Sequence, residues 1–229
     1  MNSLATGNSP FTTLFQVATR LPTIMRKMRP TWHVLSLDVV DAAFVTRHGI
    51  KGMIWDVDGT LTGDRRPTLA PEAEAAFRAL TANTGLKHVV LSNAGEERFT
   101  QLGAMFPMMP ILRAYTLGDR VLYRVLQGVR DSWTREEVER QLAAGAAVIR
   151  KPNAVLVDQA AKELGLAKDD IAMIGDQYLT DVAGANLGGV RSIKLPTLAP
   201  ETFRTSVKVS QRFELALYGL LYGRASMTT

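Results

Sequence analysis

Two aspartates placed two positions apart, at the end of an apolar run, constrain this sequence more than any other feature. The segment reads Ile54-Trp55-Asp56-Val57-Asp58-Gly59-Thr60-Leu61. Side chains on a strand alternate between its faces, so Asp56 and Asp58 project to the same side where the strand ends. Carboxylates this close repel each other unless a cation neutralises them or they share a proton. Mg²⁺ prefers oxygen ligands and attracts phosphate, so the segment predicts a Mg²⁺ site that handles phosphoryl groups.

Short apolar runs alternate with helix-period segments through the middle of the 229-residue chain. The apolar runs predict strands at 51–57, 87–91, 111–115, 171–174 and 190–195. The helical spacing predicts helices at 71–83, 95–105, 119–130, 134–144, 153–164, 179–187 and 203–221. This alternation predicts an α/β fold, with a Rossmann-like parallel sheet and helices on both faces. Ligands of such sheets bind beyond the carboxyl ends of the strands, where Asp56, Ser92 and Asp176 are expected.

The composition along the sequence divides the chain into three predicted parts. Residues 1–35 are expected to be a basic N-terminal arm, interrupted by Pro10, Pro22 and Pro30. Residues 36–200 form the α/β domain, with a helical insertion at 106–147, and residues 201–229 form an amphipathic C-terminal helix. No run of 18 apolar residues occurs, so no membrane-spanning helix is predicted. The absence of cysteine fits a reducing compartment, and we expect a cytoplasmic protein.

The charge distribution points to an anionic partner. The net charge is +5, and no acidic residue precedes Asp38, whereas four basic residues do: Arg20, Arg26, Lys27 and Arg29. A basic segment of this kind can lie on an anionic membrane surface, can pack against the domain, or can be a transit peptide. We expect peripheral membrane contact as one alternative, and we expect no nucleic-acid partner.

Four motifs stand in order along the chain. They are Asp56-Val57-Asp58-Gly59-Thr60-Leu61, then Ser92, then Lys151-Pro152, then Gly175-Asp176-Gln177-Tyr178-Leu179-Thr180-Asp181. Together they resemble the haloacid dehalogenase (HAD) superfamily of phosphotransferases. The resemblance implies a HAD-like fold and a Mg²⁺-dependent phosphatase.

The resemblance also implies roles for four catalytic residues. Asp56 would be the nucleophile, since a carboxylate can accept a phosphoryl group as an acyl phosphate. Asp58 would protonate the leaving oxygen and then deprotonate the hydrolytic water. Ser92 would donate a hydrogen bond to a phosphoryl oxygen, and Lys151 would supply positive charge to the same group.

The metal shell implied by the resemblance consists of Asp56, Asp176 and the backbone carbonyl of Asp58. Asp181 is expected to orient either a metal-bound water or the Lys151 ammonium group.

Three further residues are expected to support the phosphate site. Thr60 is expected to act more through its backbone amide than through its hydroxyl. Gly59 is expected to free the backbone for close approach to the phosphoryl group. Asn93 belongs to the polar cluster that ends the second strand.

The spacing of the motifs leaves little room for a cap domain. Only 30 residues separate Leu61 from Ser92, and 58 separate Ser92 from Lys151. A nearly capless enzyme with an open site suits large substrates. A narrower resemblance rests on Gly49-Ile50-Lys51-Gly52, on residues 175–182 and on Gly184-Ala185-Asn186. It is to capless subfamily IIIA, the group of phosphatidylglycerophosphate phosphatase, although that group commonly has Asn in place of Gly59 and Ala94.

Three functions remain open on the sequence. A lipid phosphatase fits the basic arm and the apolar C-terminal helix. A soluble HAD phosphatase would act on a sugar phosphate, a nucleotide or a phosphoprotein. A non-catalytic scaffold with this fold is the third, and the presence of Asp56, Asp58, Lys151 and Asp176 speaks against it.

Overall fold

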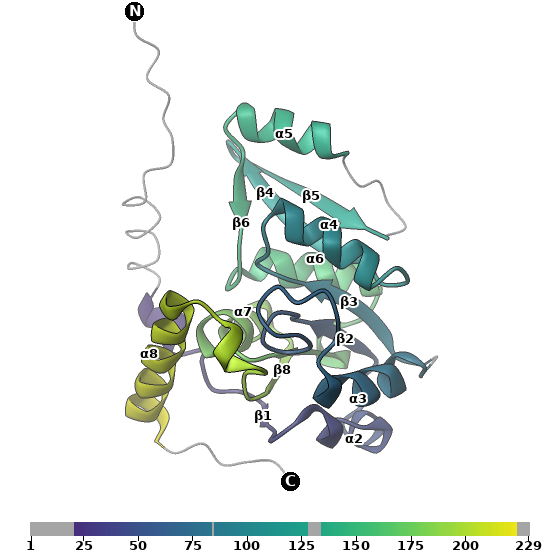
Figure 1. Cartoon of the computed structure of the whole chain (residues 1–229), viewed down its shortest axis with the longest axis vertical. Coiled ribbons are helices and arrows are strands. Elements are labelled where there is room, and N and C mark those ends of the chain that lie inside the picture. The colour runs from purple at the N-terminus through teal and green to yellow at the C-terminus, as the bar shows by residue number, and fades with distance from the viewer. Residues whose placement is uncertain (1–20, 84, 128–133, 224–229) are drawn as a thin grey trace, which may run out of the picture.

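The fold is built on one mostly parallel sheet, which confirms the predicted α/β class. The computed structural model describes residues 21–83, 85–127 and 134–223. The strand order is β1-β8-β7-β2-β3-β4-β5, with β6 paired to β4 (Figure 1). Strands β5 and β6 run antiparallel to β4, and the other pairs are parallel. The strands are β1 (Trp32–His33), β2 (Gly52–Trp55), β3 (Lys87–Leu91), β4 (Ile111–Leu117), β5 (Arg120–Leu126), β6 (Ala147–Ile149), β7 (Ile171–Gly175) and β8 (Arg191–Lys194).

Helices connect the strands and flank the sheet. The α-helices are α2 (Ala42–Arg47), α3 (Pro71–Thr81), α4 (Glu96–Met105), α5 (Arg135–Ala143), α6 (Ala154–Leu164), α7 (Ala183–Gly188) and α8 (Thr205–Tyr222). Three short 3₁₀ turns are η1 (Leu37–Val39), η2 (Lys168–Asp170) and η4 (Pro200–Thr202), and a π-helical turn η3 (Tyr178–Val182) leads into α7. No helix within the described ranges has the length and apolarity needed to span a bilayer.

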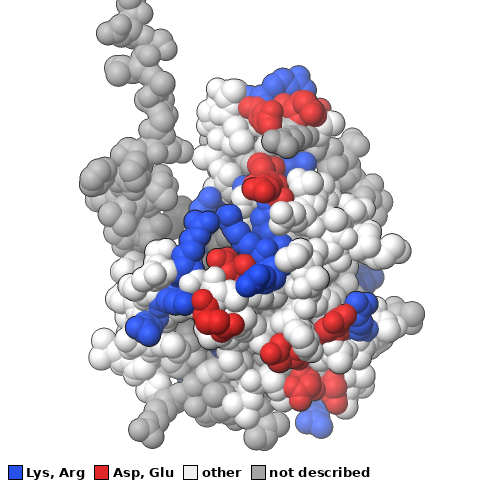
Figure 2. Space-filling model, viewed as in Figure 1, with Lys and Arg blue, Asp and Glu red and all other residues white. Residues whose placement is uncertain are grey.

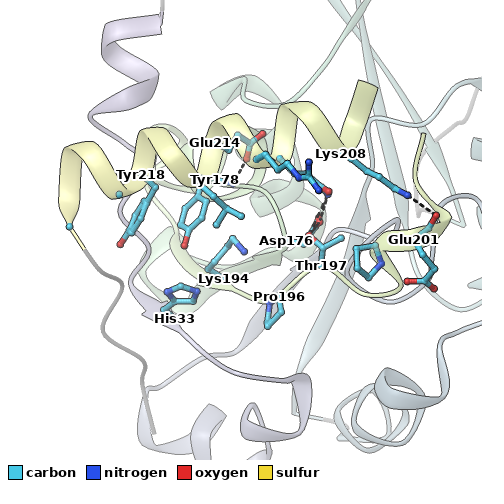
Figure 3. Close-up of a pocket in the computed structure, with 16 residues that line it drawn as sticks. His33, Asp176, Tyr178, Lys194, Pro196, Thr197, Glu201, Lys208, Glu214 and Tyr218 are labelled. Carbon is cyan, nitrogen blue, oxygen red and sulfur yellow. Dashed lines mark hydrogen bonds between the residues drawn. The ribbon is translucent and has the colours of Figure 1, made fainter. Parts of the chain in front are cut away.

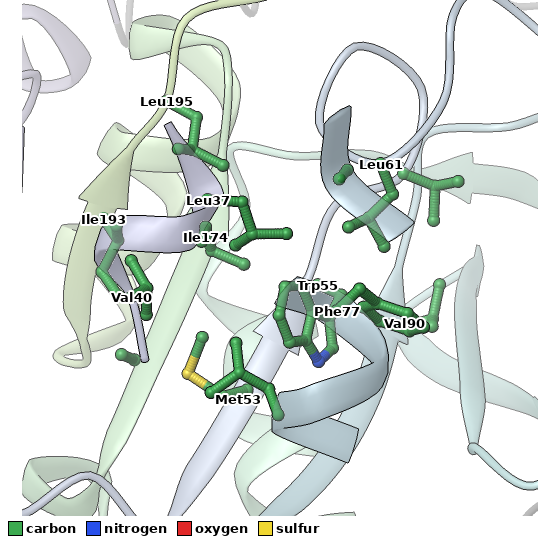
Figure 4. Close-up of a cluster of buried hydrophobic side chains, with 14 of the residues drawn as sticks. Leu37, Val40, Met53, Trp55, Leu61, Phe77, Val90, Ile174, Ile193 and Leu195 are labelled. Atoms are coloured by element: carbon green, nitrogen blue, oxygen red, sulfur yellow. The ribbon is translucent and has the colours of Figure 1, made fainter. Parts of the chain in front are cut away.

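The two faces of the sheet have separate hydrophobic cores because neighbouring side chains of β2 point in opposite directions. Met53 and Trp55 pack in the core under α2, α3 and α4, which also contains Phe77 (Figure 4). Ile54 packs on the other face, in the core that Leu156 and neighbouring residues of α6 complete. Burial on both faces fixes the position of β2, and with it the loop that begins at Asp56.

The segment 119–130 is not the helix that its sequence suggests. Residues 120–126 form β5, which pairs with β4 across a two-residue loop between Leu117 and Arg120. Gly118 has a φ of 62° in this loop, the left-handed conformation that tight hairpins need. Residues 128–133 lie outside the described part. The predicted helix at 134–144 is confirmed as α5, including its capping box of Thr134 and Glu137.

The N-terminal and C-terminal parts of the described chain lie side by side (Figure 1). Met28 and Tyr218 pack in a small shared core, and the Tyr222 hydroxyl donates to the carbonyl of Met25 at 2.7 Å. Strand β1 joins the edge of the sheet beside β8. The folded domain therefore begins before residue 36, where the sequence placed its boundary, and residues 1–20 of the predicted arm lie outside the described range.

Candidate active site

The predicted site residues gather at one edge of the sheet. Asp56 follows β2, Ser92 follows β3 and Asp176 follows β7, so the carboxyl ends of three parallel strands bring them together. Lys151 lies just before α6, whose first turn is capped by the Asn153 side chain, which accepts a hydrogen bond from the backbone of Val155 at 3.1 Å. This placement agrees with the rule that parallel sheets bind ligands beyond their carboxyl edge.

A buried lysine links two of the carboxylates. The Lys151 ammonium group lies 2.6 Å from Oδ1 of Asp56 and 2.7 Å from Oδ1 of Asp181. All three residues are buried. The Thr60 hydroxyl donates to the other oxygen of Asp56 at 3.0 Å, so both oxygens of Asp56 are held. The Thr60 hydroxyl thus contacts the predicted nucleophile directly, and the larger role expected of its backbone amide stays a prediction.

Asp176 is the third carboxylate of the site. Its Oδ2 accepts hydrogen bonds from the Thr197 hydroxyl at 2.7 Å and from the Gln211 amide at 3.2 Å. Its Oδ1 is buried and has no hydrogen-bond partner among the described residues. Burial, followed by the nearby charge of Asp181, raises the pKa of Asp176 to about 7.

The three carboxylates fit a divalent cation. Asp56, Asp176 and Asp181 each offer an oxygen, and these oxygens lie within 4.8 Å of one another. Burial is the main cause that raises the pKa of Asp56 to about 8, and Asp181 and Asp176 add to it against the opposing effect of Lys151. Lys151 and the nearby buried Lys194 bring two positive charges to three buried carboxylates, and Oδ1 of Asp176 has no donor among the described residues. Carboxylate oxygens of this kind are suitable ligands for a hard divalent cation.

Two glycines allow the carboxylates to approach the backbone this closely. Gly59 has a φ of 95°, and a Cβ atom there would lie 2.6 Å from Oδ2 of Asp176. A Cβ on Gly175 would lie 2.4 Å from Cγ of Asp181. The predicted need for close approach at Gly59 thus has a physical basis, and the group that approaches is the Asp176 carboxylate.

Asn93 joins the end of β3 to the lysine loop. Its side-chain oxygen accepts a hydrogen bond from the Lys151 backbone nitrogen at 2.8 Å, and its amide donates to the Lys151 carbonyl at 3.3 Å. This pair fixes the backbone from which the lysine side chain reaches Asp56. The Ser92 hydroxyl accepts from the backbone of Ala94 at 3.2 Å. Its role as a donor to phosphate stays a prediction.

The side chain of Asp58 does not join the carboxylate cluster. Its Oδ1 lies 2.7 Å from the guanidinium of Arg98 and also accepts hydrogen bonds from the Thr62 hydroxyl and the Arg65 backbone, both at 3.1 Å. Arg98 comes from α4 and is almost fully buried. The acid–base role of Asp58 and its carbonyl contact with a metal stay predictions, and no pattern in the sequence pointed to Arg98.

The C-terminal helix α8 reaches the site with two side chains. Gln211 donates to Asp176, and the buried Glu214 accepts a hydrogen bond from the backbone nitrogen of Leu179 at 3.3 Å. Glu214 also accepts from the backbone nitrogen of Tyr178 at 2.9 Å (Figure 3). Burial raises the pKa of Glu214 to about 7. Neither residue was predicted from the sequence, although an acidic residue on the apolar side of an amphipathic helix is a signal of a buried partner.

A cavity of about 1040 Å³ opens beside Asp176, between α8 and the end of β8. Basic, aromatic and aliphatic side chains share its lining, among them Lys194, Lys208, Arg212, Leu215 and Tyr218 (Figure 3). The site is therefore bordered by a cavity large enough for a leaving group of considerable size.

Comparison with known proteins supports the predicted superfamily. Residues 148–197, which contain Lys151, Asp176 and Asp181, match the family described as HAD-hydrolase-like. The chain is 27% identical over 150 residues to the probable phosphatase YqeG of Bacillus subtilis (strain 168), and the match covers 66% of each chain. These matches support the predicted HAD superfamily. The prediction of this superfamily and of a hydrolase is confirmed, and the printed name of the relative agrees with the predicted phosphatase class.

Two solved structures resemble this chain at low similarity. An uncharacterised protein from Listeria monocytogenes serotype 4b aligns with a TM-score of 0.43 and 18% identity, covering 68% of this chain and 83% of the other. A 4-nitrophenylphosphatase from Thermotoga maritima aligns with a TM-score of 0.30 and 14% identity, covering 71% and 90%. Because the similarity is low, the proposed function rests on the geometry of the site and not on these two structures.

The described chain has little that could form a cap domain. Between β2 and β3 the described chain has only turns and α3, as the motif spacing predicts. Between β3 and the lysine loop it has α4, β4, β5, α5 and β6, so the predicted helical insertion at 106–147 consists mainly of a β-hairpin with one helix.

Proposed function

We propose that this protein is a Mg²⁺-dependent phosphomonoesterase that works through an aspartyl phosphate on Asp56. The observation that carries the proposal is the environment of the Asp56 carboxylate. The Lys151 ammonium and the Thr60 hydroxyl hold it, and two further buried carboxylates, Asp176 and Asp181, lie beside it. The match to HAD hydrolases and the printed name of the Bacillus relative support the same class.

The chemistry proceeds in two displacements. A carboxylate oxygen of Asp56 attacks phosphorus, a P–O bond forms, and the bond to the leaving oxygen breaks. Asp58 gives the leaving oxygen a proton. A water molecule then attacks phosphorus, gives a proton to Asp58, and the Asp56–phosphorus bond breaks to release phosphate. Asp58 returns to its starting state, so its protons balance over the cycle.

Fixed charges stabilise both displacements. Lys151 opposes the negative charge that spreads over the phosphoryl oxygens, and its buried position strengthens this effect. Asp181 and the Asn93 pair keep the lysine in place. Asp56, Asp176 and the backbone carbonyl of Asp58 would hold Mg²⁺, which when bound supplies Lewis-acid polarisation of the phosphoryl group.

A lipid phosphate, such as phosphatidylglycerophosphate, is the substrate that we favour. The cavity beside Asp176 combines apolar walls with Lys208 and Arg212, as an amphiphilic phosphate requires. On the outer side of α8, Val209, Phe213 and Leu220 are 59%, 55% and 83% exposed. Their spacing places them along one side of the helix, where they can contact the acyl region of a membrane.

Contact with an anionic membrane is part of this proposal. On the face drawn in Figure 2, basic side chains border a hollow that also contains acidic ones. Such a border attracts anionic substrates and surfaces through an interaction that salt screens. A soluble phosphomonoester as substrate is the alternative outcome of the test.

The test measures phosphate release with and without Mg²⁺ from phosphatidylglycerophosphate vesicles, sugar phosphates, nucleotides and an aryl phosphate. Wild-type protein should release phosphate only with Mg²⁺, and Asp56→Asn should be inactive. Asp119→Asn, a matched change at an exposed position of the β4–β5 loop, should behave as wild type. Activity retained in Asp56→Asn would refute the nucleophile, and preference for a soluble substrate would refute the lipid.

A further inference from the structure

The Asp176 carboxylate receives hydrogen bonds from two separate parts of the chain. The Thr197 hydroxyl follows β8 and donates at 2.7 Å, and the Gln211 amide comes from α8 and donates at 3.2 Å, both to Oδ2. The Gln211 amide also lies 3.3 Å from the Thr197 hydroxyl. These contacts occupy one oxygen of Asp176 and leave Oδ1 without a partner among the described residues.

Donors on one oxygen determine how the carboxylate is oriented. A buried carboxylate with a single anchored oxygen keeps the other available to a cation, whereas an unanchored one can turn away from the cluster. Partners of metal ligands commonly act in this way, since they fix the orientation of the ligand. Gln211 is therefore placed to hold Asp176 in a metal-binding orientation.

A second side chain keeps α8 at this position. Glu214 is three residues beyond Gln211, on the same side of the helix, and binds the backbone nitrogens of Tyr178 and Leu179. Those nitrogens belong to the π-helical turn η3, which begins two residues after Asp176. One helix thus contacts both the carboxylate of Asp176 and the backbone after it.

We propose that Gln211 is a positioning residue for Asp176 and that α8, fixed by Glu214, is a structural part of the candidate metal site. The inference rests on the proposed Mg²⁺-dependent function. It assigns to the C-terminal helix a task in the site itself, in addition to forming one wall of the cavity.

The experiment compares Mg²⁺ affinity by isothermal titration calorimetry in the full-length wild type, Gln211→Ala and Gln211→Glu. Loss of an outer partner of a metal ligand typically weakens binding by about 10-fold or more. Gln211→Ala should therefore bind Mg²⁺ about 10-fold more weakly, with kcat largely restored at saturating Mg²⁺. Gln211→Glu should lose more, because it removes the donor and adds a negative charge beside Asp176. Gln159→Ala is the matched control, since this half-buried glutamine on α6 bonds to Glu163.

The outcomes separate this inference from the proposed function. Wild-type affinity in a Gln211→Ala protein that melts as the wild type does would overturn the inference, and so would a wild type that binds no Mg²⁺. Weakened Mg²⁺ binding in Gln211→Ala, together with no phosphate release by the wild type from any phosphomonoester, would support the positioning role and refute the phosphatase.

Discussion

Replacing Lys151 with methionine tests the electrostatics of the site most severely. The ammonium group lies 2.6 Å from Asp56 and 2.7 Å from Asp181, and its side chain is only 3% exposed. Methionine keeps the length of the side chain and removes the charge. Breaking a buried ion pair by removing one partner costs about 3–5 kcal/mol, because the remaining charge is left uncompensated. We expect Lys151→Met to lower the free energy of unfolding of the metal-free protein by about this amount at alkaline pH.

The stability lost in Lys151→Met should be larger at high pH than at low pH. The pKa of Asp56 is raised to about 8, mainly by burial, while Lys151 lowers it. Removing the lysine raises that pKa further, so the folded variant takes up a proton and relieves part of the repulsion at low pH. A carboxyl with a raised folded pKa loses stability as pH increases from its unfolded pKa through the folded one. The deficit of Lys151→Met should therefore be smaller at about pH 6 than at about pH 9.

Urea unfolding of the metal-free proteins at both pH values measures this deficit, and kcat with Mg²⁺ measures the catalytic effect. Removing one group that stabilises transition-state charge typically lowers kcat by about 100- to 1000-fold. Lys162→Met, an exposed lysine on α6, is the matched control and should change neither quantity. A kcat within about 10-fold of wild type, or a deficit that does not vary with pH, would refute this account of Lys151.

Three further substitutions test other contacts. Gly59→Ala should weaken Mg²⁺ binding measured by calorimetry, because its Cβ would meet Asp176 at 2.6 Å at a φ of 95°; unchanged affinity would contradict this geometry. Arg98→Met should lower the free energy of unfolding in urea by about 2–3 kcal/mol through loss of the buried pair with Asp58; a loss below about 1 kcal/mol would count against that pair. Burial lowers the pKa of His88 to about 4, so its contribution to stability is present above the unfolded pKa of 6.5 and is lost as pH falls toward 4. Over that pH range the free energy of unfolding of the wild type should fall by about 2 kcal/mol more than that of His88→Gln, a value that allows for the partial exposure of His88. An equal fall in both proteins during acid titration would refute this prediction.

The sequence predicted the parts of the site that depend on local pattern. Asp56 and Asp176 directly follow buried strands, and the end of such a strand can be recognised in the sequence because the apolar run stops there. Parallel pairing of β2 with β7 then brings the two carboxylates together without any further information. This is why the sequence alone predicted that Asp56 and Asp176 lie at one site.

The sequence did not predict contacts that depend on how distant elements pack. Arg98 is 40 positions from Asp58, and Gln211 is 35 from Asp176. Neither lies in a motif, and helical periodicity does not specify which polar side chain faces a site. The strand β5 was missed for a different reason, since Gly118 and its hairpin turn outweigh the helical spacing of the residues that follow.

Detection of a phosphoryl group on Asp56 tests the central claim most directly. The wild type and Asp58→Asn would be mixed with Mg²⁺ and a radiolabelled phosphomonoester that the wild type hydrolyses, quenched in acid, digested and analysed by mass spectrometry. The account predicts label on the peptide that contains Asp56, with more of it in Asp58→Asn because hydrolysis of the aspartyl phosphate is slowed. Active enzyme with no label on that peptide in either protein, or label on another residue, would contradict it.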